Sequence, residues 1–273
     1  MNIPRRIIQT GKSRKLKSLA KAASASLRRL HPDWEYLFFD DAEVASFVGR
    51  EFPQYRTLFE SFPCNIQRID LFRYLAVSNL GGFYIDLDVF LWSSLDSLVD
   101  SRCIFPFEEL TLNQFLRREY GMDWEVGNYA FGAVPGHPFL EAVIRNCVRA
   151  HQEPEWVEPM MKGIPAIFRS EFLVLNTTGP GLVSRTLAEN PGLARDLTVL
   201  FPEDVCDSEC WHHFGSLGVH AMEGSWRDGD SLVRRRLGNL WEAWSKRRLM
   251  RESARLGKTR SVVLRPPRVQ VVS

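Results

Sequence analysis

The chain has 273 residues, of which 45% are hydrophobic and 25% charged, and its formal net charge is +2. This composition is ordinary for a globular protein, and the chain is long enough to bury a hydrophobic core. Together they exclude an intrinsically disordered polar chain. No apolar run approaches the about 18 residues that cross a bilayer, and the first residues lack the apolar centre of a secretory leader. Five irregularly spaced cysteines favour reduced thiols and a cytoplasmic protein.

The charge is unevenly distributed. Residues 1–230 hold 23 Lys and Arg against 31 Asp and Glu, a net charge of −8, whereas residues 231–273 hold 12 against 2, a net charge of +10. We therefore expect a main domain over 1–230 and a basic C-terminal helix and tail over 231–273.

The first residues alternate between strand and helix patterns. Strands are predicted over 3–9 and within 31–41, and helices over 12–30 and 42–52, with Asp40 or Asp41 as the N-cap of the second helix. This alternation predicts an α/β fold with a largely parallel sheet, whose ligands bind beyond the carboxyl ends of the strands.

A third helix is predicted over 65–79, where Gly81 and Gly82 stop it. Asp70 and Arg73 are three residues apart on this helix and face the same way. They could form a surface ion pair of little energetic value, or both could reach the acidic strand that follows.

That strand, 83–90, alternates between apolar and polar side chains. Tyr84, Asp86 and Asp88 share one face, and bare carboxylates there would be costly to bury, so a hard divalent cation is their simplest partner. Residues two apart on a strand lie roughly 6.6 Å apart. We therefore expect one direct ligand and one that acts through water or a substrate hydroxyl, at a strand end where the chain turns.

Later elements are less regular. We expect a loop, a short helix and a strand over 93–107, a mobile flap over 108–123, and a strand, turn and helix over 127–151. A loop with broken helix is predicted over 152–165 and a late strand over 197–201. His137 is given a structural role, and Thr178 is a candidate helix cap.

Two segments carry a family resemblance. Arg68-Ile-Asp-Leu-Phe-Arg73-Tyr and Gly81-Gly-Phe-Tyr-Ile-Asp-Leu-Asp88 together resemble the Asp-x-Asp region of the sugar-nucleotide glycosyltransferases of family 32. That family includes yeast-type initiating mannosyltransferases, and the clostridial toxin glucosyltransferases share the region. The resemblance implies a glycosyltransferase-A type fold, with a Rossmann-like, mixed and mainly parallel sheet flanked by helices.

The resemblance also implies an activity. It is the retaining transfer of a hexose from UDP- or GDP-hexose to a saccharide or lipid-linked acceptor, with Mn²⁺ or Mg²⁺ as cofactor and no nucleic acid as partner. Asp88 would bind the metal directly, and Asp86 would bridge the metal and the ribose or sugar. Glu125 and Asn128 are the residues to watch for front-face attack. The implied sets are Asp86, Asp88 and Asn128 as catalytic; Gln9, Thr10, Asp70, Arg73, Tyr84, Asp86 and Trp226 as donor-binding; and Asp86, Asp88 and His220 as metal ligands.

A later segment, His220-Ala-Met-Glu-Gly-Ser-Trp226, is similar to the family's closing His-x-x-x-x-Ser-Trp pattern. Imidazole binds manganese-like ions alongside carboxylates, so His220 is the candidate third ligand, with Glu223 or Ser225 as substitutes. Trp226 would supply a flat wall and an indole donor to a phosphate oxygen.

A nearby cluster, Cys206-x-x-x-Cys210-Trp-His212-His213, offers ligand types that suit zinc. Its spacing is not that of a standard finger, and a reduced loop is the favoured interpretation.

Two rival functions are open. Residues 83–90 also match the apolar-Asp-x-Asp-x-Val opening of haloacid-dehalogenase-type phosphatases, whose first Asp is a nucleophile, although about eighty residues precede it here. The second rival function is that of a sugar-binding protein that has lost catalysis.

In the tail, Leu237, Leu240, Trp241 and Trp244 form an apolar stripe at helical spacing, followed by basic residues. The stripe would either pack on the catalytic domain or lie on an anionic membrane, at the inner face if the acceptor is lipid-linked.

Overall fold

The computed structural model describes residues 2–222, 238, 240, 243–251 and 270–272. A mixed sheet runs through the centre in the order β11-β8-β5-β7-β3-β1-β2, and β6 pairs with β5. Its strands are β1 (Arg6–Gly11), β2 (Glu35–Asp40), β3 (Gly82–Ile85), β5 (Cys103–Leu110), β6 (Trp124–Val126), β7 (Ala130–Ala133), β8 (Leu197–Leu200) and β11 (Gln270–Val272).

Neighbouring strands pair in both directions. The pairs β1–β2, β1–β3, β5–β8 and β8–β11 are parallel, whereas β3–β7, β5–β7 and β5–β6 are antiparallel. The predicted α/β class with a mixed, mainly parallel sheet is confirmed.

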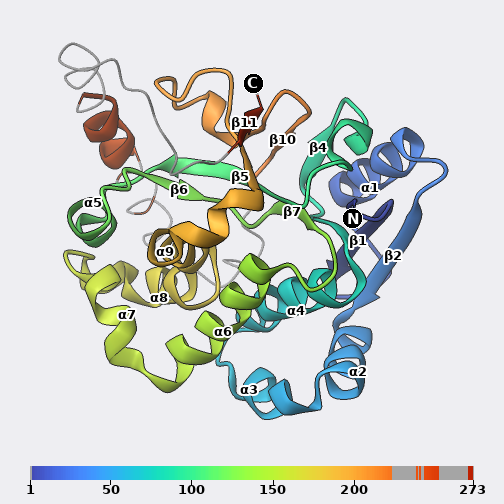
Figure 1. Ribbon diagram of the computed structural model, residues 1–273, viewed down its shortest axis with the longest axis horizontal. Coiled ribbons are helices and arrows are strands. Elements are labelled where there is room, and N and C mark those ends of the chain that lie inside the picture. Colours follow the sequence, from blue (N-terminus) through green and yellow to red (C-terminus); the bar gives the residue numbers. More distant parts are fainter. Residues whose placement is uncertain (1, 223–237, 239, 241–242, 252–269, 273) are drawn as a thin grey trace.

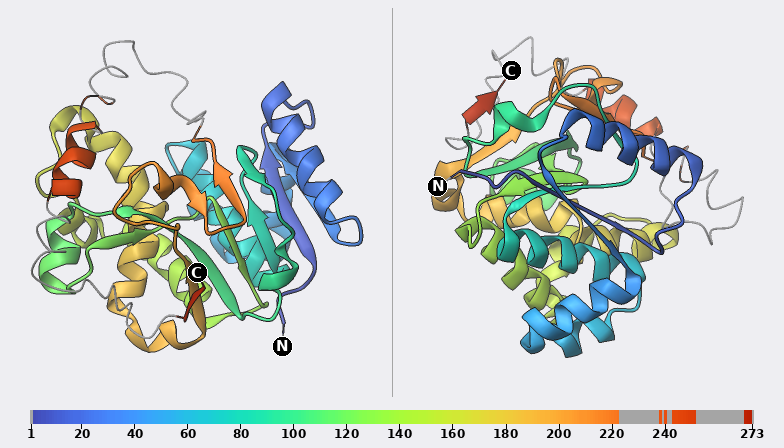
Figure 2. Two further views of the ribbon diagram at one scale, coloured as in Figure 1. Left: turned by 90° about the horizontal axis from the view of Figure 1, so that it is seen from above. Right: turned by 90° about the vertical axis from the view of Figure 1, so that its right-hand side faces the viewer.

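Helices cover the two faces unequally (Figures 1 and 2). Most lie on one side of the sheet, whereas α1 and a small sheet, ordered β4-β10-β9, lie on the other. The helices are α1 (Ser18–Leu30), α2 (Asp41–Glu51), α3 (Arg56–Ser61), α4 (Asn65–Leu80), α5 (Gln114–Glu119), α6 (Pro138–Gln152), α7 (Pro154–Met161), α8 (Arg169–Thr177) and α9 (Pro180–Glu189); the small sheet comprises β4 (Val89–Leu91), β9 (His213–Phe214) and β10 (Gly218–His220).

A separate hydrophobic core lies against each face of the sheet. On β3, Tyr84 belongs to the core under the helices, whereas Phe83 and Ile85 belong to the core under α1 and the small sheet. This alternation matches the two-residue period of the sequence. Burial on both faces fixes the register of β3, because a slip of one residue would exchange the two sets of side chains.

Local signals explain where the helices begin and end. Asp40 caps α2 in a capping box with Glu43, as predicted. Gly81 follows α4 with φ of 66°, a left-handed conformation that favours glycine, and a Cβ there would collide with Pro135 and Pro4.

Three segments differ from prediction. The helix predicted from residue 12 begins at Ser18, because the residues before it form a bend and an extended segment after β1. Residues 152–165 contain helix α7, which has a proline in its first turn and a second, Pro159, inside it, and which buries Trp156. The predicted flap over 108–123 instead contributes the end of β5 and helix α5, which is anchored by the fully buried Leu116.

Parts of the tail contact the main domain. Among the described helical residues 240 and 243–251, Leu249 packs into the core under the helices, whereas Leu240 and Trp244 are exposed. β11 adds a strand to the edge of the sheet. Leu237 and Trp241 lie outside the described residues, and the domain boundary at 230 stays a prediction. Among the described residues, no helix is both long and apolar enough to cross a bilayer.

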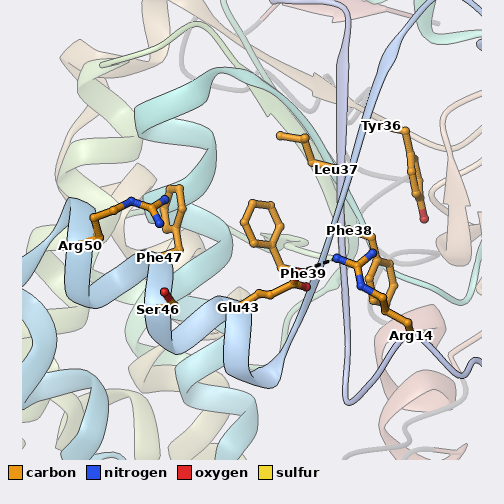
Figure 3. A pocket seen from close by; sticks show the side chains of 9 residues that line it. All are labelled: Arg14, Tyr36, Leu37, Phe38, Phe39, Glu43, Ser46, Phe47 and Arg50. Carbon is orange, nitrogen blue, oxygen red and sulfur yellow. Dashed lines mark hydrogen bonds and ion pairs between the residues drawn. The ribbon is translucent and has the colours of Figure 1, made fainter.

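A pocket of about 410 Å³ lies beside β2 and α2 at the opposite edge of the sheet (Figure 3). Arg14 pairs with Glu43 there, with Nη2 2.5 Å from Oε1. None of the predicted site residues that the structure describes lines this pocket.

Candidate active site

The Asp-x-Asp segment leaves the central sheet as a turn. The strand predicted over 83–90 is interrupted: β3 ends at Ile85, β4 begins at Val89, and Asp86 and Asp88 lie on the connection between them. The Asp86 N–H donates to the Tyr129 carbonyl at 2.8 Å, which fixes the start of the turn. Ligand atoms of Asp86, Asp88 and His220 all lie within 4.8 Å of one another. The two aspartates follow the end of β3, so the predicted position at a strand end where the chain turns is confirmed.

Arg73 is the buried cation behind this turn. Its side chain is only 4% exposed, and its guanidinium lies 3.3 Å from both Asp70 and Asp86. It also donates to the Asn128 carbonyl at 2.8 Å and lies over the Tyr84 ring. This burial excludes the surface ion pair, so α4 delivers both of its charged residues to the site.

Asp70 is held by neutral donors as well as by Arg73. It accepts hydrogen bonds from Thr178 Oγ1 at 2.8 Å and from Asn128 Nδ2 at 3.1 Å. Burial raises the pKa of Asp70 to about 6, against the opposing effects of Arg73 and Thr178. Asp70 and Asn128 therefore meet in one hydrogen-bonded network.

Thr178 does not cap a helix, contrary to prediction. The N-cap of α9 is Gly179, without a side-chain cap. The Thr178 hydroxyl instead donates to Asp70, 108 residues away in the sequence. Its partner is non-local, so the local Thr-Gly-Pro pattern could not identify it.

The predicted donor-binding residues of β1 lie behind the turn. Thr10 Oγ1 is 2.9 Å from the Tyr84 hydroxyl, which donates to Asp86 at 2.8 Å. Gln9 is fully buried, and its amide donates to the Ile85 carbonyl at 3.1 Å and accepts from side chains of α1 and β2. Both residues thus position the Asp86 turn, and their contact with a donor stays a prediction.

His220 approaches the turn from the small sheet. β10 pairs with β4 so that His220 lies opposite Val89, and its Nε2 is 3.3 Å from Asp88 Oδ1. Tyr129 stacks on the imidazole at 4.3 Å between ring centroids. Burial lowers the pKa of His220, but the hydrogen bond and charge of Asp88 outweigh it and raise the pKa overall. The proposed substitutes and Trp226 (223, 225 and 226) lie outside the described residues.

The charges and ligand types fit a divalent cation. Asp70 and Asp86 both pair with the guanidinium of Arg73, and Asp88 lies beside His220, so three carboxylates gather at this turn. Burial raises the pKa of Asp86, against the opposing effect of Arg73. Two carboxylates and an imidazole suit Mn²⁺, and carboxylates suit Mg²⁺. Asp86, Asp88 and His220 are the residues that would hold the ion.

Sequence analysis missed a buried carboxylate, Glu108, beside this site. β5 and β6 are out of register between Phe107 and Leu110, which places Glu108 on the irregular stretch. Its Oε2 is buried without a hydrogen-bond partner, and a Cβ at Gly127 would collide with it. Burial raises the pKa of Glu108 to about 7; His220 opposes this shift, whereas Glu125 and Asp86 add to it.

Glu125, predicted as a residue to watch, lies on β6 and accepts a hydrogen bond from Thr111. Burial raises its pKa. Glu108 and Glu125 each lie in a strand whose other residues are mainly apolar. A charged residue in an apolar strand is the sequence signal that could have identified Glu108.

This site lies on an α/β fold with a mixed sheet, and it combines an acidic turn after a central strand with a buried Asp–Arg pair and an opposing histidine. These features agree with the resemblance to the Asp-x-Asp glycosyltransferases. Residues 18–105 match the family model described as a glycosyltransferase sugar-binding region containing a DXD motif. The resemblance to family 32 is thereby confirmed.

Named relatives agree with this class. The chain is 34% identical over 147 residues to inositol phosphoceramide mannosyltransferase 3 of Schizosaccharomyces pombe, covering 54% of this chain and 38% of the relative. It is 30% identical over 182 residues to mannosyl phosphorylinositol ceramide synthase SUR1 of Saccharomyces cerevisiae, covering 67% and 41%. The chain thus spans less than half the length of these relatives.

A solved structure, the UDP-bound glycosyltransferase domain of the YGT toxin, is similar with a TM-score of 0.48 and 8% identity, over 72% of this chain and 79% of that one.

Proposed function

We propose that the chain is a metal-dependent glycosyltransferase that moves a hexose from a nucleotide-diphosphate sugar to an acceptor hydroxyl. The observation that carries the proposal is the cluster of Asp86, Asp88 and His220 beside the buried Asp70–Arg73 pair. The cluster supplies ligands for a cation, and the pair supplies fixed polar groups next to it. A site that binds a nucleotide-diphosphate sugar needs both features: a cation for the diphosphate and fixed polar groups for the sugar.

The protein groups divide the work by position. A divalent ion held by Asp86, Asp88 and His220 would supply Lewis-acid stabilisation of the leaving diphosphate. Arg73 holds Asp70 and Asp86 in fixed orientations, so these carboxylates need little reorganisation when a sugar binds.

Asn128 is the residue that links this charged network to the strand carrying Glu125. Its amide contacts Asp70, and its carbonyl accepts from Arg73. In a transfer that retains configuration by front-face attack, Asn128 would orient the transferred sugar. Glu125 lies on the adjoining strand and receives no covalent role.

The names of the relatives narrow the substrates. We propose mannose as the hexose, carried on a GDP or UDP leaving group, and an inositol phosphate headgroup or saccharide on a lipid as the acceptor. The tail is suited to such an acceptor. Trp244 is 48% exposed and Arg248 lies over its ring, a combination suited to an anionic membrane surface. We place this contact at the inner face of a membrane.

A binding screen tests the proposal. Nucleotide sugars are added to the full chain with Mn²⁺ or with chelator, and the unfolding midpoint is measured. A cognate donor at 100 times its Kd should add about 2.7 kcal/mol, or roughly 5 °C for a chain of this size. Asp88→Asn should abolish the Mn²⁺-dependent part of the shift.

The rival functions give different results. No stabilisation by any nucleotide hexose, together with hydrolysis of simple phosphate esters, would favour the phosphatase. Metal-dependent donor binding without transfer or donor hydrolysis would favour a sugar-binding protein.

A further inference from the structure

A second group of metal-ligating side chains lies between β8 and β10, in a segment to which the proposed transfer gives no role. Glu203, Cys210 and His213 each offer one ligand atom, and all three atoms lie within 4.8 Å of one another. His213 Nδ1 is 2.7 Å from Glu203 Oε2. This set of ligands differs from the one that the sequence motif suggested, because it includes Glu203 and leaves out Cys206 and His212.

The backbone around this group is already folded into turns. The Cys206 N–H donates to Asp204 Oδ1 at 2.7 Å, and the Glu209 N–H donates to Asp207 Oδ1 at 3.0 Å. Trp211 is 1% exposed and anchors the segment to the core. These contacts fix the backbone between Glu203 and His213, whose side chains already pair without a metal.

The segment around this group carries a concentration of negative charge that favours cation binding. Four carboxylates, those of Glu203, Asp204, Asp207 and Glu209, occur within seven residues, and the sequence from 196 to 222 contains no lysine or arginine. Like charges so close together repel one another, and a bound divalent ion would offset that repulsion. Asp207 Oδ2 also lies 3.9 Å from Cys210 Sγ, inside this acidic surround.

We propose that Glu203, Cys210 and His213 form a zinc site distinct from the Asp-x-Asp centre. A thiolate, an imidazole and a carboxylate are together a zinc donor set, with the fourth position left to water. The thiolate sets this site apart, because the Asp-x-Asp centre has no sulfur ligand and suits harder cations.

The ion would act as a clip between distant parts of the segment. It would join Glu203, which follows β8, to His213, the first residue of β9. β9 pairs with β10, which carries His220, so the clip would hold the strand that presents the candidate ligand of the other site.

Cobalt provides a test that reads the thiolate directly. The metal-stripped, reduced full chain is titrated with Co²⁺, and the near-ultraviolet thiolate-to-cobalt charge-transfer band is recorded. We expect one equivalent of band-forming Co²⁺, displaced by Zn²⁺. Cys210→Ser should abolish the band, and Glu203→Gln should keep it but weaken Co²⁺ affinity by about 10-fold or more.

Two matched controls locate the signal. Cys206→Ser removes a thiol four residues away and should leave the band and affinity unchanged. Asp88→Asn should also leave them unchanged, so failure here is separable from failure of the proposed transfer. Circular dichroism checks the fold of each variant. Absence of the band in the wild-type chain, its survival in Cys210→Ser, or its loss in folded Cys206→Ser would overturn the zinc site.

Discussion

Glu108→Gln should change how the stability of the protein depends on pH. In the folded chain the pKa of Glu108 is raised from 4.5 to about 7, chiefly by burial. Between these two values the folded state binds a proton that the unfolded state has released, so the free energy of unfolding falls as pH rises. Ionisation of the buried carboxylate therefore destabilises the folded state. This penalty is complete above pH 7 and small below pH 4.5.

The magnitude follows from the pKa difference. At about 1.4 kcal/mol per pH unit, the penalty reaches roughly 3 kcal/mol at pH 8 and stays under about 1 kcal/mol at pH 5. Glutamine has the same shape and never ionises. The free energy of unfolding of Glu108→Gln, relative to wild type, should therefore increase by roughly 2 kcal/mol from pH 5 to pH 8. Any packing effect of the substitution that does not depend on pH cancels when the two pH values are compared.

Urea unfolding, followed by tryptophan fluorescence at both pH values with chelator present, measures the change. Glu119→Gln is the matched control, because Glu119 is exposed, and it should show no such pH dependence. A Glu108→Gln difference that is constant from pH 5 to pH 8 would refute the burial of an ionisable carboxylate beside the site. A difference of opposite sign would mean that a cationic group neutralises Glu108.

Three further outcomes are expected. His220→Ala should weaken Mn²⁺ affinity by about 10-fold or more in a metal titration, and an unchanged titration would make His220 a purely structural residue. Thr178→Val removes a hydrogen bond to the buried Asp70 carboxylate and should cost about 1.5–3 kcal/mol in urea unfolding, whereas no loss would show that the contact is energetically unimportant. The full chain should co-sediment with anionic but not neutral vesicles, less so at high salt, and not at all without residues 231–273; equal recovery with both vesicle types, or none with either, would leave the tail as a packing element.

Much of the site was predictable because its signals are local. The period of α4 and its glycine stop placed Asp70 and Arg73 on one helix face, and the acidic strand followed directly. Alternation along 83–90 identified the two aspartates, and the cost of burying them indicated a cation. The chain turns after β3, as predicted, whereas the burial of Arg73 decides between the two alternatives that the sequence left open.

The remaining features depend on pairings between distant segments. Thr178 reaches Asp70 only because α8 and α9 pack near α4, and Glu108 is buried only because β5 and β6 shift register. β11 pairs with β8, which lies about 70 residues earlier in the sequence, and no local pattern marks this partner. Glu203 and His213 meet in the same way, whereas cysteine spacing directed attention to Cys206.

The most direct measurement of the proposed function is turnover of a labelled nucleotide hexose. Purified full chain is incubated with GDP-mannose or UDP-hexose and an inositol phosphate lipid acceptor, with Mn²⁺ or with excess chelator, and the labelled product is quantified. We expect metal-dependent transfer or donor hydrolysis by wild type, and loss of both in a folded Asp88→Asn variant. Full turnover in excess chelator, or an Asp88→Asn variant as active as wild type, would contradict the assignment of the Asp86–Asp88–His220 cluster as the catalytic metal centre.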